Sequence, residues 1–190
     1  LGQQKVFGPV QTIQSNNGFV FGGTDNSAWR LKKKLAGGGP LMDMGIYVIQ
    51  GARYTTGEEP LWVKARQEKT RPEFFNEVEE TVYWQMAFPG GCLATCKTSY
   101  NENGNSLHAN AAQGWFELSE AYRYGGMAGA TSKGPMNFPQ INQQAAQMDA
   151  FVRNVRSNTP SLVAGEEGRL DMKVVEAIYR SLDSGQQENV

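Results

Sequence analysis

Five consecutive segments decide the fold of this sequence: WVKARQEKT (62–70), ETVYWQMAF (80–88), CLATCKTSY (92–100), SLHANAAQ (106–113) and WFELS (115–119). Each segment alternates polar with apolar residues or is rich in β-branched and aromatic residues, which is typical of β-strands. Short stretches of turn composition, such as Pro89-Gly90-Gly91, separate them. The segments therefore predict five successive strands of a meandering antiparallel sheet.

Helices are expected on both sides of these strands. Three glycines lead into Pro40, and proline suits the first turn of a helix because its missing N–H would be unpaired there. The apolar pattern that follows predicts about four turns, fading at Thr55-Thr56-Gly57. Apolar stripes within 141–155 and 170–182 predict two amphipathic helices that close the chain, the second ending at Gly185.

Other parts of the chain carry weaker signals. Residues 1–17 alternate as an extended strand does, and Gly18 to Phe21 continue in the same way. Residues 24–34 are polar and irregular, which predicts a loop. Residues 125–139, GGMAGATSKGPMNFP, are glycine-rich and aperiodic, and a long loop of this kind inside a compact domain is usually functional or mobile. We expect it to line a pocket.

Segregated strands and helices indicate an α+β fold, with one large, open, mostly antiparallel sheet and helices packed on one face. The length of 190 residues fits one domain, residues 1–190. The second sheet face, to which we assign Trp84 and Met86, would then be open. Because monomers rarely leave large apolar patches exposed, we expect a homo-oligomer formed through this face.

Composition indicates which classes of binding partner to expect. Lys and Arg number 18 against 19 acidic residues, which gives no reason to expect nucleic acid. No apolar run is long enough to span a bilayer, so no membrane is expected. Cys92 and Cys96 lie about 13 Å apart along one strand, too far for a disulfide. The only histidine, His108, has no neighbouring ligands in the sequence, so no metal site is predicted.

Asp43 and Tyr47 are the strongest catalytic candidates. Four residues apart on a helix, they share one face. A carboxylate beside a phenol suits a reaction in which a hydroxyl proton moves together with a hydride. A phenol, with a pKa near 10, needs a nearby cation to act in this way, and none lies at helical spacing. Alternatively, Asp43 stabilises the helix N-terminus and Tyr47 is an interfacial aromatic residue.

Several further residues have two readings. Trp29 and Arg30 suit contact with a nucleotide or sugar, or simple surface packing. Tyr122 and Tyr124 lie beyond the last of the five strands, just before the glycine-rich segment, and suit contact with a sugar, or exposure on a strand. The glycines before Pro40 either cradle an anion or pack closely against a neighbour. No G-x-G-x-x-G follows a strand, so the dinucleotide fingerprint is missing from this sequence.

The segment WRLKKKLAGGGPLMDMGIYVIQGARYTTGEEP (29–60) resembles the glucose-fructose oxidoreductase branch of the Gfo/Idh/MocA family, which also contains inositol dehydrogenase-like enzymes. The resemblance extends through ETVYWQMAF, the TSY of residues 98–100 and GEEGRLDMKVVEAIYRSLDSG (165–185). It implies a C-terminal substrate-binding and oligomerisation domain like that of glyceraldehyde-3-phosphate dehydrogenase. It also implies an N-terminal Rossmann domain that is absent from this chain.

The resemblance further implies roles for individual residues. The family segment GGG-x-L-x-D-x-G-x-H supplies an active-site aspartate and histidine, which correspond to Asp43 and Tyr47. Tyrosine at the second position matches the glucose-fructose branch, where it is the proposed proton donor or acceptor. The Trp29-Arg30 pair would contact the nicotinamide cofactor, and Tyr124, or less so Tyr122, would approach the sugar. The family's catalytic lysine, in a Glu-Lys-Pro segment of the first domain, is the cation missing here.

We therefore expect part of an NADP- or NAD-dependent oxidoreductase that acts on a sugar or a cyclic polyol. The chain alone should be inactive, because nothing holds the nicotinamide in line with the substrate. A non-catalytic sugar-binding or assembly module, and a regulatory sugar sensor, remain the alternatives. The sequence leaves the sugar, the choice of cofactor and the compartment open, with the cytoplasm as default and periplasmic export possible.

Overall fold

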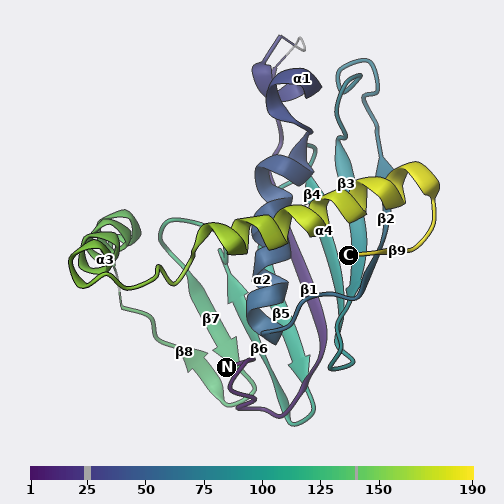
Figure 1. Ribbon diagram of the computed structural model, residues 1–190. Coiled ribbons are helices and arrows are strands. Elements are labelled where there is room, and N and C mark those ends of the chain that lie inside the picture. The colour runs from purple at the N-terminus through teal and green to yellow at the C-terminus, as the bar shows by residue number, and fades with distance from the viewer. Residues whose placement is uncertain (24–26, 140) are drawn as a thin grey trace.

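The computed structural model describes residues 1–23, 27–139 and 141–190. In these residues the chain forms one sheet of nine strands with its main helices across one face (Figure 1), which confirms the expected α+β class. From one edge to the other, the strands are β8 (Gly134–Met136), β7 (Ala128–Thr131), β6 (Gly114–Ser119), β5 (Gly104–Ala111), β1 (Val10–Gly18), β4 (Leu93–Ser99), β3 (Thr81–Ala87), β2 (Trp62–Glu68) and β9 (Glu188–Asn189).

The first strand of the chain, β1, lies in the middle of the sheet. It pairs in parallel with β4 and antiparallel with β5, so that Ile13 stands between Ala94 and Ala109. The predicted uninterrupted meander of five strands is therefore wrong. Strands β2 to β4 form one meander and β5 to β8 another, and β1 fills the space between them. Strand periodicity is local and carries no information about which strands become neighbours.

The extended segment at the N-terminus is shorter than predicted. Regular pairing begins at Val10 and ends at Gly18, where a Cβ atom would lie 2.7 Å from the carbonyl oxygens of Ser99 and Glu102. Beyond Gly18 the chain leaves the sheet but stays beside it, since Phe21 donates a backbone hydrogen bond of 2.8 Å to Tyr100. The predicted strand over Gly18–Phe21 is thus an irregular segment that follows the end of β4.

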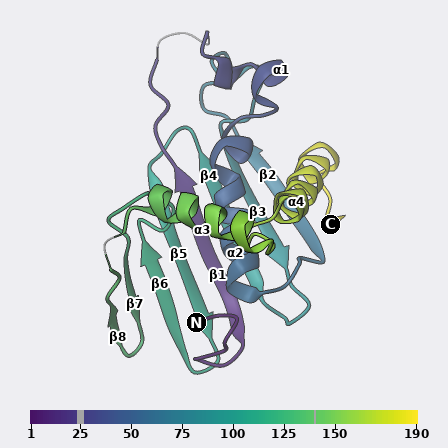
Figure 2. The ribbon, with the colours of Figure 1, turned by 60° about the vertical axis from the view of Figure 1, so that its left-hand side comes forward.

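Two helices cover the sheet face that carries the core. A π-helical turn (Leu41–Gly45) leads into α2 (Ile46–Thr56), and α4 (Gly165–Ser184) crosses the strands beside it (Figure 2). Val48 and Ile49 of α2 and Val174 and Ile178 of α4 are fully or almost fully buried in the core cluster. Each such side chain stabilises the fold by about 1.5–3 kcal/mol. The helices predicted from Pro40 and before Gly185 are confirmed, and Gly185 has the left-handed φ of 68°.

The assignment of Trp84 and Met86 to an open sheet face is wrong. Both side chains are buried in the cluster that contains the α2 and α4 residues, so they lie on the covered face. The open face carries the alternate residues of the strands, and the register places Trp62, Leu93 and Trp115 in one row across it. The period of two was correct, but the sequence does not say which of the two faces receives the helices.

Two segments predicted as loops contain regular structure. Part of residues 24–34 lies outside the described residues (24–26), but Trp29–Leu31 forms a 3-10 turn and α1 spans Lys33–Ala36. The glycine-rich stretch 125–139 contains β7 and β8, which pair at the sheet edge. Their four and three residues are too short for a periodic signal, and neighbouring strands supply the hydrogen bonds that propensity does not indicate.

Helix α3 (Gln143–Ser157) forms as predicted, but its apolar stripe is uncovered. Met148, Phe151 and Val155 are 63–68% exposed, and none of the residues of α3 is buried. Its half-buried positions include Ala150 and Asn154, which lie on the opposite side of the helix. The helix therefore turns its apolar face away from the domain, contrary to the usual orientation of a surface helix.

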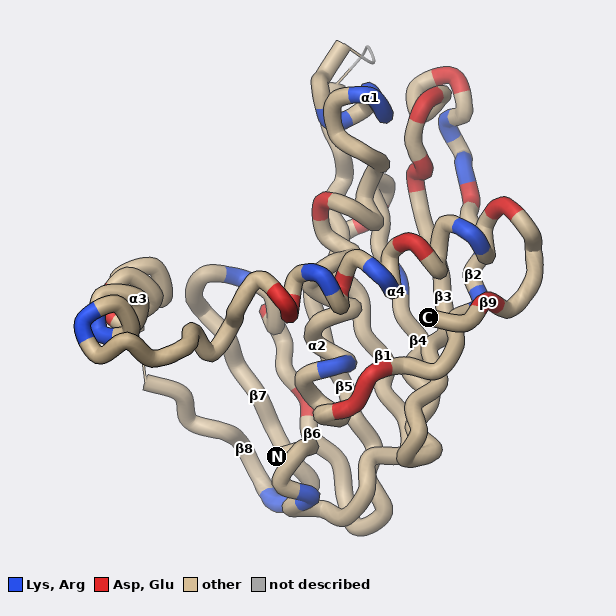
Figure 3. Tube along the Cα trace, in the orientation of Figure 1, with Lys and Arg blue, Asp and Glu red and all other residues tan. Residues whose placement is uncertain are grey.

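Charged residues hold α2 against α4. The Arg53 side chain of α2 is 3% exposed and donates to Asp171 of α4, to Glu59 at 2.6 and 2.7 Å, and to Glu167 at 3.2 Å. Elsewhere, acidic and basic residues are interspersed along α4 without forming a face of one sign (Figure 3). No helix in the described part of the chain is long and apolar enough to cross a membrane.

We expect Arg53→Met to lower the free energy of unfolding of residues 1–190 by about 3–5 kcal/mol, because it leaves the Asp171 carboxylate buried without a cation. Urea unfolding measures the change. Arg66→Met is the matched control, since Arg66 is 66% exposed and lies 3.8 Å from Glu68, and such a pair contributes about 0–1 kcal/mol. Equal effects of the two substitutions would contradict the assigned role of Arg53.

Candidate functional site

A hollow of about 480 Å³ lies where the π-helical turn, the start of α2 and the segment after β1 meet. Five of the six residues singled out from the sequence line it, although they come from segments up to 94 positions apart, Arg30 to Tyr124. The full lining is Asn17, Phe19, Phe21, Arg30, Asp43, Met44, Tyr47, Tyr122 and Tyr124.

The start of the helix is fixed to the sheet by Thr98. This residue of β4 is fully buried, and its hydroxyl lies 2.9 Å from the backbone oxygen of Asn17 and 3.1 Å from that of Pro40. A single hydroxyl hydrogen is thus shared between β1 and the first turn of the helix. Gly45 allows this approach, because a Cβ there would lie 3.3 Å from the Thr98 methyl group and 2.9 Å from Leu41.

The glycines before Pro40 serve close packing. A Cβ on Gly38 would lie 1.9 Å from the Tyr179 hydroxyl, and one on Gly39 would lie 2.5 Å from the backbone oxygen of Glu79. The Glu79 carboxylate accepts hydrogen bonds from the backbone N–H of Leu41 at 3.2 Å and from Tyr179 at 2.9 Å. The protein's own carboxylate therefore occupies the helix N-terminus that was considered as a cradle for an external anion.

Asp43 is held by two partners. The hydroxyl of Tyr100, a residue that is 1% exposed, donates to Asp43 Oδ2 at 2.8 Å. Arg30 Nε lies 3.4 Å from the same oxygen. Burial, followed by the hydrogen bond and charge of Asp43, raises the pKa of Tyr100 far above its ordinary value. Tyr100 therefore stays protonated and acts as a permanent donor to the carboxylate.

Tyr47 is the reachable phenol of the hollow. Its side chain is 48% exposed, and it borders both this hollow and a second one of about 650 Å³ that continues along α2 toward Leu162 and Val163. Asp43 stands in the π-helical turn and Tyr47 follows four residues later in α2, and both side chains line this hollow. A ligand in the hollow would thus meet a fixed carboxylate and an accessible hydroxyl together.

Tyr122 and Tyr124 differ in availability. The Tyr122 hydroxyl is 2.5 Å from Ser15 Oγ and lies under α2, where a Cβ on Gly51 would approach it to 2.7 Å. Burial raises the pKa of Tyr122, although its hydrogen bond with Ser15 acts in the opposite direction. Tyr124 is 74% exposed. Both line the hollow, but of these two tyrosines only Tyr124 presents an exposed phenol.

Trp29 does not line the hollow. It is 54% exposed, and the Arg30 guanidinium lies 4.5 Å from the centre of its ring. This contact orients Arg30, whose Nε reaches Asp43. The pair therefore stands at the rim, with the cation turned to the site and the indole beside it.

Sequence reasoning missed four lining residues and one buried partner. Phe19 and Phe21 were assigned to a strand, and Asn17 and Met44 carried no signal that distinguishes them from structural residues. Tyr100 was present only in the TSY segment. Its position directly after a strand, next to a polar loop, could have placed it at the end of the sheet, but nothing in the sequence pointed to its partner Asp43.

The remaining polar groups of the described residues are dispersed or buried. Among residues 1–23, 27–139 and 141–190, no group of three or more His, Cys, Asp or Glu side chains is arranged to hold an ion. Cys92 and Cys96 are free, buried thiols, and burial raises the pKa of Cys92 to about 11. Both therefore remain protonated, and the hollow offers carboxylate, phenol and guanidinium groups, which suit proton transfer and the binding of a polyhydroxylated ligand.

Comparisons with known proteins agree with this arrangement. The family described as the GFO/IDH/MocA C-terminal domain matches residues 1–119. D-xylose 1-dehydrogenase [NADP(+)] of Haloarcula marismortui is 25% identical over 166 residues, which cover 84% of this chain and 46% of that protein. This chain thus spans about half the length of that relative.

Solved structures extend the likeness over nearly the whole chain. Aldose-aldose oxidoreductase from Caulobacter crescentus, crystallised with glycerol, is 37% identical with a TM-score of 0.93, over 99% of this chain and 58% of that one. Levoglucosan dehydrogenase, in complex with NADH and levoglucosan, shares the fold with a TM-score of 0.82 at 16% identity, over 99% and 60% of the two chains. The family match covers well over half of the sequence, and this chain belongs to the GFO/IDH/MocA family as one of its C-terminal domains.

Proposed function

We propose that this chain is the substrate-binding half of an NADP- or NAD-dependent oxidoreductase that acts on a sugar or a cyclic polyol. One observation carries the proposal: Arg30, Asp43 and Tyr47 line a single hollow of about 480 Å³, a volume that suits a monosaccharide. The names of the relatives, an NADP-dependent xylose dehydrogenase and an aldose-aldose oxidoreductase, support the same class of reaction.

Tyr47 is the proposed proton donor and acceptor. Its exposed phenol can reach the oxygen of the sugar carbon that changes oxidation state, so the proton can leave or arrive there as the carbon is oxidised or reduced. Asp43 orients the substrate by accepting a hydrogen bond from a neighbouring hydroxyl. Tyr124, or less so Tyr122, also contacts the sugar in the hollow, and the exposed phenol of Tyr124 supports this order.

The nicotinamide would supply the hydride chemistry when bound. The cation of Arg30 at the rim and the indole of Trp29 beside it fit a contact with a nicotinamide nucleotide. The described residues contain no glycine-rich strand-to-helix turn of the kind that cradles a pyrophosphate. We therefore assign most of the cofactor contacts to a separate nucleotide-binding domain, and the relatives' additional length supports such a partner.

We expect Tyr47→Phe and Asp43→Asn to lower kcat for sugar-dependent reduction of NADP by the complete enzyme by about 10² or more, because each removes a group that acts on the reacting hydroxyl. Nucleotide fluorescence should show that the cofactor still binds. Tyr54→Phe is the matched control, since Tyr54 is two turns further along α2, 69% exposed and outside the hollow. Undiminished turnover in Tyr47→Phe would refute the assignment, and residues 1–190 alone should be inactive.

The uncovered stripe of α3 is the proposed contact for the nucleotide-binding domain. Gln143 at its start donates a hydrogen bond of 3.3 Å to the backbone oxygen of Arg123, next to the tyrosines of the hollow. The linker after α3 borders the second hollow through Leu162 and Val163, together with Tyr47. A domain that brings a nicotinamide to Tyr47 from this side would lie beside α3, where Met148 and Phe151 stand exposed.

We therefore expect amide hydrogen exchange in residues 143–157 to be at least about tenfold slower in the complete enzyme than in residues 1–190 alone, since covering a phenylalanine contributes about 1.5–3 kcal/mol. Phe151→Glu should abolish this protection. Ala146→Glu, on the opposite side of the helix, should leave it in place. Equal exchange in the complete enzyme and the isolated domain would disprove the contact.

The open face of the sheet is the proposed homo-oligomer surface. Its row of Trp62, Leu93 and Trp115 is only partly buried, among polar neighbours. Burying such a row against a second copy would remove apolar area from water.

We expect residues 1–190 to sediment as a dimer or a larger oligomer. Leu93→Glu should raise the dissociation constant of this oligomer at least about tenfold, because it places a charge within the row that the second copy would bury. Leu35→Glu, on α1 and 67% exposed, should have no effect. A monomeric wild-type chain at micromolar concentration would count against this interface.

A further inference from the structure

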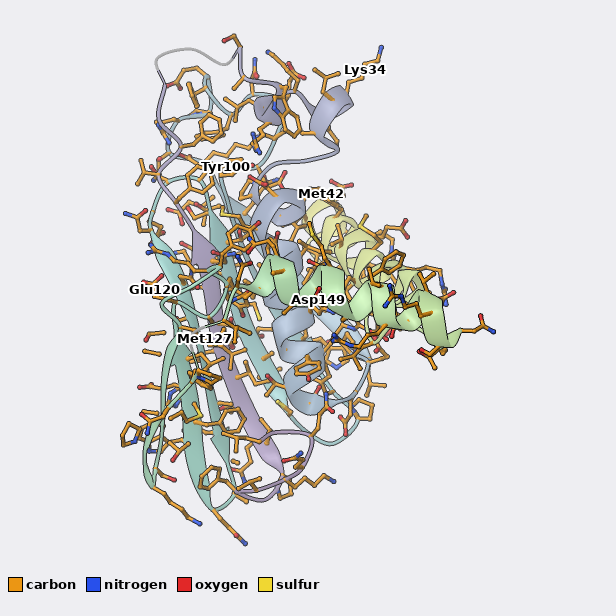
Figure 4. All side chains as sticks on the ribbon, turned by 90° about the vertical axis from the view of Figure 1, so that its left-hand side faces the viewer. Lys34, Met42, Tyr100, Glu120, Met127 and Asp149 are labelled. Carbon is orange, nitrogen blue, oxygen red and sulfur yellow. The ribbon has the colours of Figure 1, made fainter. Side chains whose placement is uncertain are left out.

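Tyr100 is the one tyrosine of the site that is enclosed by other aromatic rings. It follows β4 directly and is 1% exposed. Its ring centre lies 5.3 Å from that of Phe19, 5.1 Å from that of Phe21 and 6.2 Å from that of Phe75. In Figure 4 it lies at the end of the sheet nearest the start of α2, the level at which Met42 is also found.

The backbone around Tyr100 leaves its ring little freedom. The Tyr100 N–H donates to the backbone oxygen of Glu80 at 2.8 Å, and the Tyr100 oxygen accepts from Phe21 N–H at 2.8 Å and from Arg71 Nη2 at 3.4 Å. Glu80 is itself fully buried and accepts hydrogen bonds from Thr70 and Arg71. Both backbone polar groups of Tyr100 are thus paired, and the ring projects from this fixed backbone into the cluster of aromatic rings.

Packing alone does not require a hydroxyl at this position. The neighbouring rings are phenylalanines, and a phenylalanine would fill the same volume as Tyr100. Among the described residues, the hydroxyl forms one hydrogen bond, to Asp43 Oδ2 at 2.8 Å. A buried hydroxyl is costly to desolvate unless it forms a hydrogen bond, so the carboxylate is the reason that a tyrosine can stand here.

We propose that Tyr100 is a positioning residue, which fixes the Asp43 carboxylate through Oδ2 and leaves Oδ1 to accept a hydroxyl of the sugar. The inference rests on the proposed function, in which Asp43 orients the substrate. In the described part of the chain, the carboxylate has a hydrogen bond with Tyr100 and an ion pair with Arg30, and both involve Oδ2. The second oxygen keeps its acceptor capacity for a ligand.

Arg30 cannot fix the carboxylate to the same extent. Its side chain is 44% exposed and its Nε is 3.4 Å from Oδ2, so solvent screens the pair and the arginine retains conformational freedom. The buried phenol of Tyr100 has neither weakness. Tyr100 also remains protonated, because burial and the adjacent carboxylate disfavour the phenolate. It therefore orients Asp43 without exchanging protons, whereas Tyr47 is the phenol that reaches the ligand.

The test compares Tyr100→Phe with Tyr179→Phe. Tyr179 donates to Glu79 at 2.9 Å, so the control removes an equivalent phenol–carboxylate bond outside the hollow. In the complete enzyme we expect Tyr100→Phe to lower kcat/KM for the sugar by about 10-fold to 100-fold, as expected for a lost hydrogen bond to a charged group. Tyr179→Phe should leave kcat/KM unchanged at a similar melting temperature.

A second measurement is independent of activity. Three-bond couplings across the Cα–Cβ bond of Asp43, measured by NMR in residues 1–190, should report one rotamer in the wild type and in Tyr179→Phe, and rotamer averaging in Tyr100→Phe. A single Asp43 rotamer in Tyr100→Phe, or an unchanged kcat/KM, overturns the positioning role. Averaged couplings in a protein whose wild type reduces no nucleotide would support the positioning role and refute the proposed function instead.

Discussion

The insertion of β1 between β4 and β5 is the constraint on which the rest of the domain depends. It joins two separate meanders into one sheet, and it brings Asn17 to the end of β4. There the buried hydroxyl of Thr98 lies within hydrogen-bonding distance of the backbone of both β1 and Pro40. The direction in which α2 leaves the sheet therefore depends on the position of β1. The direction of α2 in turn determines where the Asp43 and Tyr47 side chains lie.

The candidate site divides into a rigid part and an accessible part. Tyr100, Thr98 and the buried carboxylate of Glu80 are held by paired polar groups in a region of low dielectric, where a satisfied hydrogen bond resists rearrangement. Tyr47 and other groups at the mouth of the hollow are solvated. This division suits a domain that supplies a preformed acceptor for its ligand and completes its remaining contacts with a partner.

The sequence predicted most of the elements but not their neighbours. Five strands, the helix from Pro40 and the last two helices follow from periodicity and from the Pro and Gly signals at their ends, and the pairing of Asp43 with Tyr47 follows from helical spacing. The position of β1 and the face occupied by Trp84 depend on contacts distant in sequence, which no local pattern records. Tyr100 was missed as a residue of the site for the same reason, because its partner Asp43 lies 57 residues away in the sequence.

The π-helical turn at Leu41–Gly45 makes the number of residues between Pro40 and α2 critical for the site. A π turn accommodates one more residue than an α turn in nearly the same rise, so the residues before the turn are out of phase with α2, as compared with a regular helix. Deleting one residue from this turn would rotate everything before it by about 100° relative to α2. A change in the length of the turn would therefore separate the Asp43 carboxylate from the Tyr47 phenol, even if every side chain of the site were retained.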